Sequence, residues 1–489
     1  MDLATLTGTI AGWLWSTPMI LLCLGVGLYF TIAMKVPQAR LLKDMVSNLL
    51  GGGDSENGIS SFQGFAMALG GRIGVGNIAG VATAIYFGGP GAIFWMWVIA
   101  FVGAACAFSE SALAQVWKEE INGEYRGGPA YYIEHGTGLK WLAVLFAIAG
   151  IIANALTGPT IQAFNIADAA KNAFGINPAI VGLSVAFLFA VIIFGGLKRI
   201  GKVAEYIVPF MAIVYIVLAL IILVINARQI PSMFALIFRS AFGKEALFGA
   251  IYGKTIMWGV KRGVYSSEAG MGSGAQASAA AEVSHPAKQG LAQSFSVYVD
   301  TLFVCTATGL MILSTGCYNV VDAAGDLLVN NLPDVAQGTA YTQAAIDSVF
   351  PGFGSIFIAV AMFFFAFTTL LSFAVYSDCN VAYLFKNSKY FKQITMGFKV
   401  LLLVMIVFGS LRSSDVAWNM ADIGVGLSAW INLIAMILLR KKAIAVLKDY
   451  EDQKKQGLDP VFSPEKAGFK NAGLWNSISK RSYSNLNAK

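Results

Sequence analysis

The sequence predicts an all-α, polytopic membrane protein built as an inverted five-plus-five helix repeat with one extra N-terminal helix. Of its 489 residues, 57% are hydrophobic and only 12% are charged, whereas a soluble protein averages about 25% charged residues. About eleven apolar windows are long enough to cross a bilayer. Two of these windows, the second and the seventh, are interrupted by glycines and charges.

The expected spans follow one another closely along the chain. They centre on residues 12–34, 62–86, 91–116, 139–168, 178–197, 203–226, 245–284, 289–317, 353–385, 393–411 and 414–439. The five cysteines lie mostly inside these runs, so we expect them to pack as apolar residues rather than to form disulfides. The net charge of +7 gathers in short loops and the tail, which suits an anionic membrane face rather than a nucleic acid.

The distribution of Lys and Arg predicts the orientation of the chain. Most basic loop residues fall on one side if the N-terminus is outside: Lys35, Arg40, Lys43, Lys118, Arg126, Lys198, Arg199, Lys202, Lys288, Lys386, Lys389, Lys392, Arg440, Lys441 and Lys442. The segment 318–352 falls on the other side and has no Lys or Arg. The positive-inside rule therefore predicts a cytoplasmic C-terminus. Arg228, Arg239 and Lys244, in a predicted outer loop, are exceptions.

The second span is interrupted at residues 70–80, with the sequence GGRIGVGNIAG. Glycine costs about 1 kcal/mol in a helix interior, and Arg costs about 3 kcal/mol or more at bilayer depth. Irregular backbone at this depth is tolerated only where it is buried in protein or lines a cavity. The segment therefore predicts a broken helix whose free backbone groups face a ligand.

A second glycine-rich interruption, at residues 258–274, lies in the seventh span. Because the second and seventh spans differ by five in span number, which is odd, the two broken helices run in opposite directions. This predicts inverted repeats at 59–240 and 241–442, flanked by a peripheral first helix and loop at 1–58 and a cytoplasmic tail at 443–489. The alternative is that both are packing helices rich in small residues, although charges beside the glycines do not help packing.

The first break offers both an anion site and a cation site. The amides of Gly74, Val75 and Gly76 begin the outer half-helix, where the helix dipole favours a carboxylate. The carbonyls of Gly70 and Ile73 end the inner half-helix and suit Na⁺ or an ammonium group. Such a pair of sites fits an amino-acid zwitterion with Na⁺, and the amide of Asn77 can serve either ligand.

Three further polar residues are candidates, each with a structural alternative. Thr368 and Thr369, in a Phe-rich span, can complete a Na⁺ shell or can bond back to carbonyls of their own helix. Gln162 can hold the ammonium or side chain of a substrate, or can make an interhelical hydrogen bond. Two histidines, His135 and His285, do not make a metal site.

Several stretches resemble signatures of the bacterial and archaeal alanine/glycine:cation (sodium:alanine) symporters, and the chain is similar to the alanine/glutamine transporters of Gram-positive bacteria. These are residues 74–85, 88–97 and 259–272, with His285-Pro286 and Gln289-Gly290. The resemblance implies a leucine-transporter-like fold with one extra helix. It also implies Na⁺- or H⁺-coupled import of a small neutral amino acid across a bacterial plasma membrane, with no cofactor besides Na⁺ as coupling ion.

The resemblance also implies roles for individual residues. The implied substrate contacts are Gly74, Val75, Gly76, Asn77, Gln162, Gly259 and Phe373, and the implied Na⁺ ligands are Gly70, Ile73, Thr368 and Thr369. The family often has Thr where this chain has Val75, and can have Trp where it has Phe373. Val75 lacks a hydroxyl near the carboxylate, and Phe373 leaves a roomier pocket than Trp, so glutamine is a candidate substrate beside alanine and glycine.

Other function classes fit less well. A channel needs a continuous polar pore, whereas the polar groups cluster at two breaks. A membrane enzyme would need a nucleophile with its base, or a phosphate loop, and 70–80 lacks the Lys of a P-loop. A transporter-like amino-acid sensor stays open as an alternative.

Charges within the expected spans need partners. Arg72 and Asp300 are at similar depth by residue count, so we expect Arg72 to pair with Asp300 in preference to Glu110. The alternative is that Arg72 occupies a cation site. Lys261 and Arg262 are expected to pair with Glu268, either statically or as a gate. The tail from 443 is expected to form a short helix that runs into disorder on the inner face.

Overall fold

The computed structural model describes residues 2–49 and 58–487, and these are predominantly helical. The chain begins with α1 (Leu3–Leu14) and α2 (Thr17–Ala33), which meet at a bend of 45°. Two short helices follow, α3 (Pro37–Arg40) and α4 (Leu42–Ser47). The predicted first span thus corresponds to α2 and the end of α1.

The next group of elements contains the first break. It consists of α5 (Ser61–Arg72), η1 (Gly76–Gly80), α6 (Val81–Gly88), α7 (Ala92–Val116), the hairpin strands β1 (Glu119–Ile121) and β2 (Glu124–Arg126), α8 (Pro129–Thr137), α9 (Lys140–Ile151), η2 (Ile152–Thr157), α10 (Gly158–Phe174), α11 (Pro178–Ile193) and α12 (Gly196–Ile225).

The last group contains the second break. It consists of η3 (Ala227–Gln229), α13 (Ile230–Ala241), η4 (Ala246–Ile251), α14 (Tyr252–Ser267), α15 (Ser273–Ala280), α16 (Pro286–Val297), η5 (Tyr298–Cys305), α17 (Thr306–Thr315), the hairpin strands β3 (Asn319–Val321) and β4 (Leu327–Asn330), α18 (Thr339–Asp347), α19 (Gly354–Phe385), α20 (Phe391–Ser410), α21 (Ser414–Lys455) and α22 (Trp475–Asn487).

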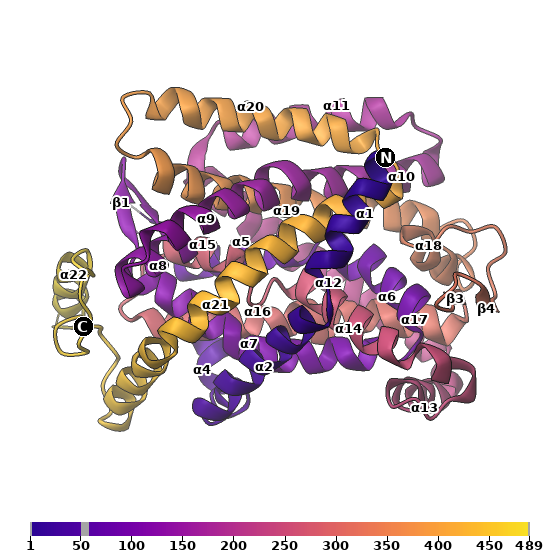
Figure 1. Cartoon of the computed structure of the whole chain (residues 1–489), viewed down its shortest axis with the longest axis horizontal. Coiled ribbons are helices and arrows are strands. Elements are labelled where there is room, and N and C mark those ends of the chain that lie inside the picture. Colours follow the sequence, from indigo (N-terminus) through magenta and orange to yellow (C-terminus); the bar gives the residue numbers. More distant parts are fainter. Residues whose placement is uncertain (1, 50–57, 488–489) are drawn as a thin grey trace.

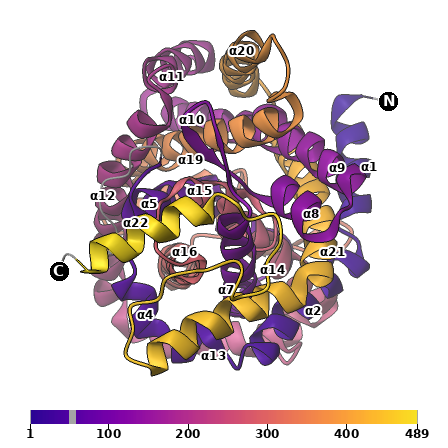
Figure 2. The same cartoon turned by 90° about the vertical axis from the view of Figure 1, so that its left-hand side faces the viewer.

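The two broken helices cross each other in opposite directions, as the sequence predicts. The first half of one packs on the second half of the other: α5 contacts α15, and α14 contacts α6. A parallel bridge joins Ile59, just before α5, to Ala281, just after α15. In Figure 2, the end view from the side of α22, the helices α5, α7, α14, α15 and α16 lie inside a ring of other helices.

Local sequence explains where the broken helices begin and end. Ser60 and Gln63 form a capping box that starts α5. Gly89, at a φ of 70°, follows the end of α6. Between α14 and α15, Glu268, Gly270 and Gly272 all have positive φ values, which reverses the chain direction locally and separates the two half-helices.

The expected number of about eleven spans is not confirmed. Among the described residues, seven helices are long and apolar enough to cross a membrane, or nine if each of the bent pairs α1–α2 and α5–α6 is one span. α11 is apolar but has only 16 residues. The pair α14–α15 falls outside this count, and Lys261, Arg262 and Glu268 lie along it.

The tail differs from the expectation of a short helix that leads into disorder. α21 continues as one helix to Lys455, and the chain then folds back across the end of the molecule to α22 (Figure 2). The buried side chains of Phe462 and Trp475 anchor it, with ring centroids 5.1 Å apart. Trp475 donates to the carbonyl of Gln115 at 2.9 Å. The tail packs because its few aromatic side chains are buried against apolar side chains of the helical body, a contact that composition alone does not predict. Residues 488 and 489 lie outside the described part of the chain.

Candidate substrate and cation sites at the helix breaks

At the first break, backbone amides that lack a partner within the helix donate hydrogen bonds to side-chain oxygens. Ile73 leaves the helical conformation with a ψ of 87°. The amide of Gly74 donates to Oδ1 of Asn77 at 2.8 Å, and the amide of Val75 donates to Oε1 of Gln162 at 3.3 Å. Both acceptors are amide oxygens, so a substrate carboxylate would replace a weaker acceptor by a charged one.

A narrow cavity separates this break from the second one. Its lining residues are Gly71, Arg72, Gly74, Gly76, Ala153, Asn154, Gly158, Gln162, Tyr265, Glu268, Met271, Phe373, Ala421 and Val425. The structure thus brings together four residues of the predicted substrate site, namely Gly74, Gly76, Gln162 and Phe373. Gly158, at the start of α10, has no side chain, which lets the ring of Phe373 pack directly against the backbone there.

The other predicted substrate residues do not line this cavity. Val75 reaches the site through its amide, and Asn77 caps the break from behind, since its Nδ2 donates to Asp300 Oδ1 at 2.6 Å. Gly259 lies elsewhere: a Cβ atom there would be 2.5 Å from Cβ of Trp95 and 2.6 Å from the carbonyl oxygen of Ala92. We therefore correct the expectation for Gly259, whose lack of a side chain allows α14 to pack closely on α7.

The predicted Na⁺ ligands are adjacent but not equivalent. Thr369 Oγ1 lies 2.9 Å from the carbonyl oxygen of Gly70 at the end of α5, and 3.0 Å from the carbonyl oxygen of Phe365 in its own helix. Thr368 Oγ1 instead donates to carbonyls of its own helix, those of Phe364 and Phe365, both at 3.0 Å. The geometry favours Thr369 over Thr368 as a cation ligand.

The predicted pairing of Arg72 with Asp300 is wrong as a direct contact. Arg72 is 1% exposed and donates from Nε to the carbonyl of Ser267 at 2.6 Å and from Nη1 to Oε1 of Gln293 at 2.8 Å. Asp300 accepts from Asn77, and from Ser266 at 3.0 Å. Depth along a helix did not reveal which face each side chain occupies. Neutral acceptors bind Nε and Nη1 of the guanidinium, and Nη2 has no hydrogen-bond partner among the described residues. Arg72 thereby ties the first break to the backbone of the second.

The expected pairing of Lys261 and Arg262 with Glu268 is also wrong, because their partner is Asp422 of α21. Lys261 Nζ lies 2.6 Å from Asp422 Oδ2, and Arg262 Nη1 lies 2.9 Å from Oδ1. The guanidinium also stacks 4.1 Å from the ring of Trp418. Both cations precede the break on α14, whereas Glu268 follows them and points into the cavity.

These contacts form a barrier on one side of the cavity. The rings of Tyr265, which lines the cavity, and Trp418 are 5.4 Å apart. Beyond them lies a second hollow lined by Lys261, Arg262 and Asp422. The cavity is therefore separated from this hollow by one aromatic pair and one buried ion cluster.

Comparison with known proteins decides the family. A sequence profile described as the sodium:alanine symporter family matches residues 1–464. The chain belongs to this family. The sodium/proton-dependent alanine carrier protein of Bacillus sp. (strain PS3) is 49% identical over 88% of this chain and 96% of that protein. GlnT of Bacillus subtilis (strain 168), whose name describes sodium/glutamine symport, is 42% identical over 92% of this chain and 91% of its own.

A solved structure shows the fold of this symporter. MhsT in complex with L-phenylalanine superposes with a TM-score of 0.53 at 15% identity, covering 87% of this chain and 97% of MhsT. At this identity the likeness concerns the fold alone, which is leucine-transporter-like. The chain is thus a multi-pass membrane transporter and not an enzyme.

Two residues with structural contacts near the helix breaks, Asn432 and Asp422, were not predicted from the sequence. Asn432 of α21 donates to Glu110 Oε2 at 3.0 Å and to the carbonyl of Gly270 at 2.9 Å, and the amide of Gly272 donates to the same carboxylate at 3.1 Å. This cluster fixes the second break. Asp422 could have been recognised as a candidate because it is a carboxylate inside an apolar span. Its cationic partners on α14 could not be predicted from the sequence.

Proposed function

We propose that this protein is a Na⁺-coupled symporter that imports a small neutral amino acid by alternating access. The observation that carries the proposal is the first break, where the amides of Gly74 and Val75 lie one helix turn from the carbonyl of Gly70 and the hydroxyl of Thr369. Donors for a carboxylate and oxygens for a hard cation thus occupy neighbouring positions. The names of the related alanine and glutamine carriers support the substrate class.

We propose that the substrate carboxylate binds the amides of Gly74, Val75 and Gly76, and that Asn77 and Gln162 release their present bonds to those amides. Gly70, Ile73, Thr369 and Thr368 are the proposed Na⁺ ligands. Arg72 and Glu268 both border the cavity. Because their charges oppose each other, the cavity favours a net-neutral zwitterion over an acidic or basic amino acid.

The size of the substrate is set at Phe373 and Gly158. A Cβ atom at Gly158 would lie 3.0 Å from Cδ2 of Phe373, so the ring closes the cavity against the backbone of α10. Rotation of that ring would admit a longer side chain such as that of glutamine. Competition of alanine, glycine and glutamine for uptake into proteoliposomes, under an imposed Na⁺ gradient, tests both the activity and the substrate.

Replacement of Thr369 by Val is expected to raise the half-saturating Na⁺ concentration about tenfold, the equivalent of about 1.4 kcal/mol. The change keeps the shape of the side chain and removes the oxygen that faces Gly70. Thr368→Val is the matched control, because the Thr368 hydroxyl bonds its own helix and should shift the Na⁺ dependence less. If Thr368→Val shifted the Na⁺ dependence as much as Thr369→Val, or more, Thr369 would not be the preferred Na⁺ ligand.

A proton is the second candidate for the coupling ion, and Glu268 favours it. This carboxylate is 3% exposed, lines the cavity, and has the hydroxyl of Tyr376 3.4 Å from its Oε2. A buried carboxylate without a cationic ion-pair partner among the described residues is suited to bind and release a proton.

Glu268→Gln is therefore expected to abolish any uptake driven by a proton gradient and to leave Na⁺-driven uptake within about threefold of the wild type. Uptake is measured with each gradient imposed separately. Glu120→Gln, an exposed carboxylate on β1, is the control. If the proton-driven component survives in Glu268→Gln, Glu268 is not the proton site.

We propose an outside N-terminus and a cytoplasmic C-terminus, on the strength of the basic loops. The barrier of Tyr265, Trp418 and Asp422 then lies on the outer side of the cavity, and the bridge from Ile59 to Ala281 lies on the inner side. The repeats 59–240 and 241–442 would move against each other so that one side opens while the other stays closed.

A further inference from the structure

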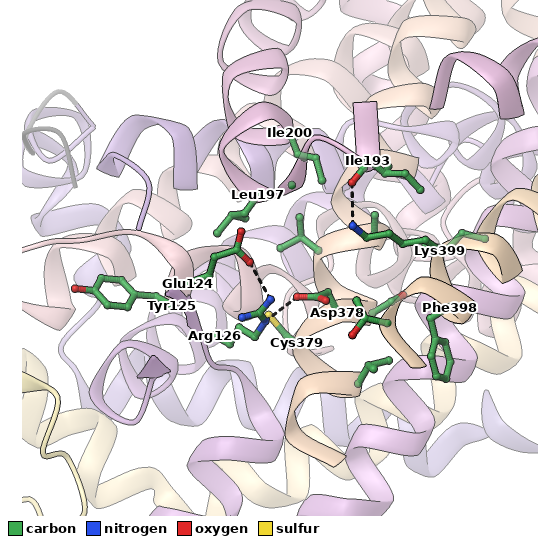
Figure 3. A pocket seen from close by; sticks show the side chains of 17 residues that line it. Glu124, Tyr125, Arg126, Ile193, Leu197, Ile200, Asp378, Cys379, Phe398 and Lys399 are labelled. Atoms are coloured by element: carbon green, nitrogen blue, oxygen red, sulfur yellow. Dashed lines mark hydrogen bonds and ion pairs between the residues drawn. The ribbon is translucent and has the colours of Figure 1, made fainter. Parts of the chain in front are cut away.

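A second cavity lies apart from the helix breaks, at the edge of the molecule. It is larger than the cavity at the breaks and shares no lining residue with it. Its walls come from β2, the turn between α11 and α12, and the facing sides of α19 and α20 (Figure 3). In both cartoon views, α11 and α20 form the outermost layer of the molecule (Figures 1 and 2). The cavity therefore lies behind a layer whose outer face meets lipid.

Apolar side chains form much of the wall, among them Ile193, Leu197, Ile200 and Leu402. The cavity is level with the end of α11 and the start of α12, where the chain turns, and with the hairpin strand β2. Loops and hairpins mark the boundary between hydrocarbon and water. The cavity thus joins apolar walls to the headgroup level of one leaflet.

Lys399 brings a positive charge to this cavity. Its Nζ donates to the carbonyl of Ile193 at the end of α11, 3.2 Å away, and lies 5.7 Å from the ring of Phe194. Its ammonium forms no ion pair with an Asp or Glu of the described residues. The C-terminus of a helix attracts a cation, but the neutral carbonyl of Ile193 does not compensate the positive charge of Lys399. The other N–H groups of the ammonium are available to an anion.

Two hydroxyls beside Lys399 have no hydrogen-bond partner in the described chain. Ser377 of α19 is 1% exposed and its Oγ is unpaired, and Thr395, one helical turn before Lys399 on α20, has an unpaired and buried Oγ1. Both residues line the cavity. Buried hydroxyls are rarely left without a partner, so an acceptor is expected in the cavity itself.

A second charged group faces the same cavity. Arg126 is 6% exposed and binds Asp378 Oδ2 from Nε at 2.7 Å and Glu124 Oε2 from Nη2 at 2.8 Å (Figure 3). Two carboxylates around one guanidinium leave this group with a net negative charge. Together with Lys399, the four ionised side chains of the cavity sum to zero, and Lys399 forms no ion pair with either of the two carboxylates.

We propose that this cavity binds a phospholipid whose headgroup combines a phosphate with a primary ammonium, that is, a phosphatidylethanolamine. The phosphate accepts from Lys399 and from the hydroxyls of Ser377 and Thr395. The ammonium donates to the carboxylates of Asp378 and Glu124, and an acyl chain lies along the apolar wall.

The charge balance distinguishes this lipid from others. A phosphatidylglycerol would bring a net negative charge to a cavity that is already neutral, and it has no ammonium to offset the excess negative charge of Asp378 and Glu124 over Arg126. A phosphatidylcholine carries three methyl groups on nitrogen and has no N–H to donate to those carboxylates. The same phosphate contacts are available to all three lipids, so selectivity depends on the ammonium.

The test uses the full chain purified in detergent and titrated separately with palmitoyl-oleoyl phosphatidylethanolamine, phosphatidylglycerol and phosphatidylcholine. Bound lipid is counted by native mass spectrometry, and the shift in Tm is followed in parallel. We expect the ethanolamine lipid to be retained at least about tenfold more tightly than the other two. Equal retention of the three lipids, or preference for phosphatidylglycerol, would overturn the proposal.

Variants locate the site. Lys399→Met is expected to weaken retention of the ethanolamine lipid about tenfold, whereas Lys392→Met, an exposed lysine two turns earlier on α20 that does not line the cavity, should have no effect. If Lys399→Met fails to fold, the double variant Ser377→Ala with Thr395→Val removes the two hydroxyls without changing charge. If Lys399→Met retains the lipid as the wild type does, the lipid binds elsewhere. The same conclusion would follow from unchanged retention in the double variant, if Lys399→Met does not fold. Lipid retention does not depend on transport, so it is independent of the proposed coupling ion.

Discussion

Gly76→Leu is expected to reduce amino-acid uptake roughly 100-fold or more, while the protein still inserts into the membrane. A Cβ atom at this position would lie 3.1 Å from Cα of Ser266 and 3.1 Å from Cδ1 of Tyr265. Backbone cannot give way as a side chain can, so the larger group must enter the cavity beside the amide of Gly74. Initial uptake rates in proteoliposomes, corrected for the amount of inserted protein, measure the loss.

The control for this variant is Gly397→Leu on α20. A Cβ atom at Gly397 meets nothing within 4 Å, and the helix lies in the outer layer of the molecule. The same change of residue there should leave uptake near the wild-type rate. Transport by Gly76→Leu at the rate of Gly397→Leu would exclude the first break as the substrate site.

Asp422→Asn is expected to lower the stability of the folded protein by about 3–5 kcal/mol, because it leaves two buried cations without their counter-ion. The side chains of Lys261, Arg262 and Asp422 are 9%, 2% and 3% exposed. Their net charge rises from one positive charge to two when the carboxylate is lost. The loss is measured as a fall in Tm in detergent, together with loss of uptake.

A second substitution tests whether charge is the cause. Asp422→Asn combined with Lys261→Met restores the net charge of the cluster, so the double variant should be more stable than Asp422→Asn alone. Asp415→Asn, an exposed carboxylate on the same helix, is the control and should change Tm little. A double variant that melts no higher than Asp422→Asn would mean that Asp422 acts by some means other than neutralising Lys261.

Much of this protein could be predicted from its sequence. The composition and the long apolar runs indicate that most of the surface faces lipid, and they therefore predict a membrane protein. Glycines beside a charge inside an apolar run can only be accommodated where backbone is released from the helix, so the breaks at 70–80 and 258–274 were visible. An odd difference in span number, from the second to the seventh, predicts that they run in opposite directions, which the packing of α5 on α15 and of α14 on α6 confirms.

Only the tertiary structure decided which side chains meet across those helices. Residue counting gives depth but not the direction in which a side chain points, so Arg72 finds Ser267 and Gln293 rather than Asp300, and Lys261 finds Asp422 rather than Glu268. Thr368 and Thr369 are adjacent in sequence and 100° apart around the helix, and only the hydroxyl of Thr369 is hydrogen-bonded to the carbonyl of Gly70. The sequence by itself thus determined that the helices break and in which direction they run. The partners of each charge and hydroxyl depend on helix packing, because they are set by contacts between residues far apart in the chain.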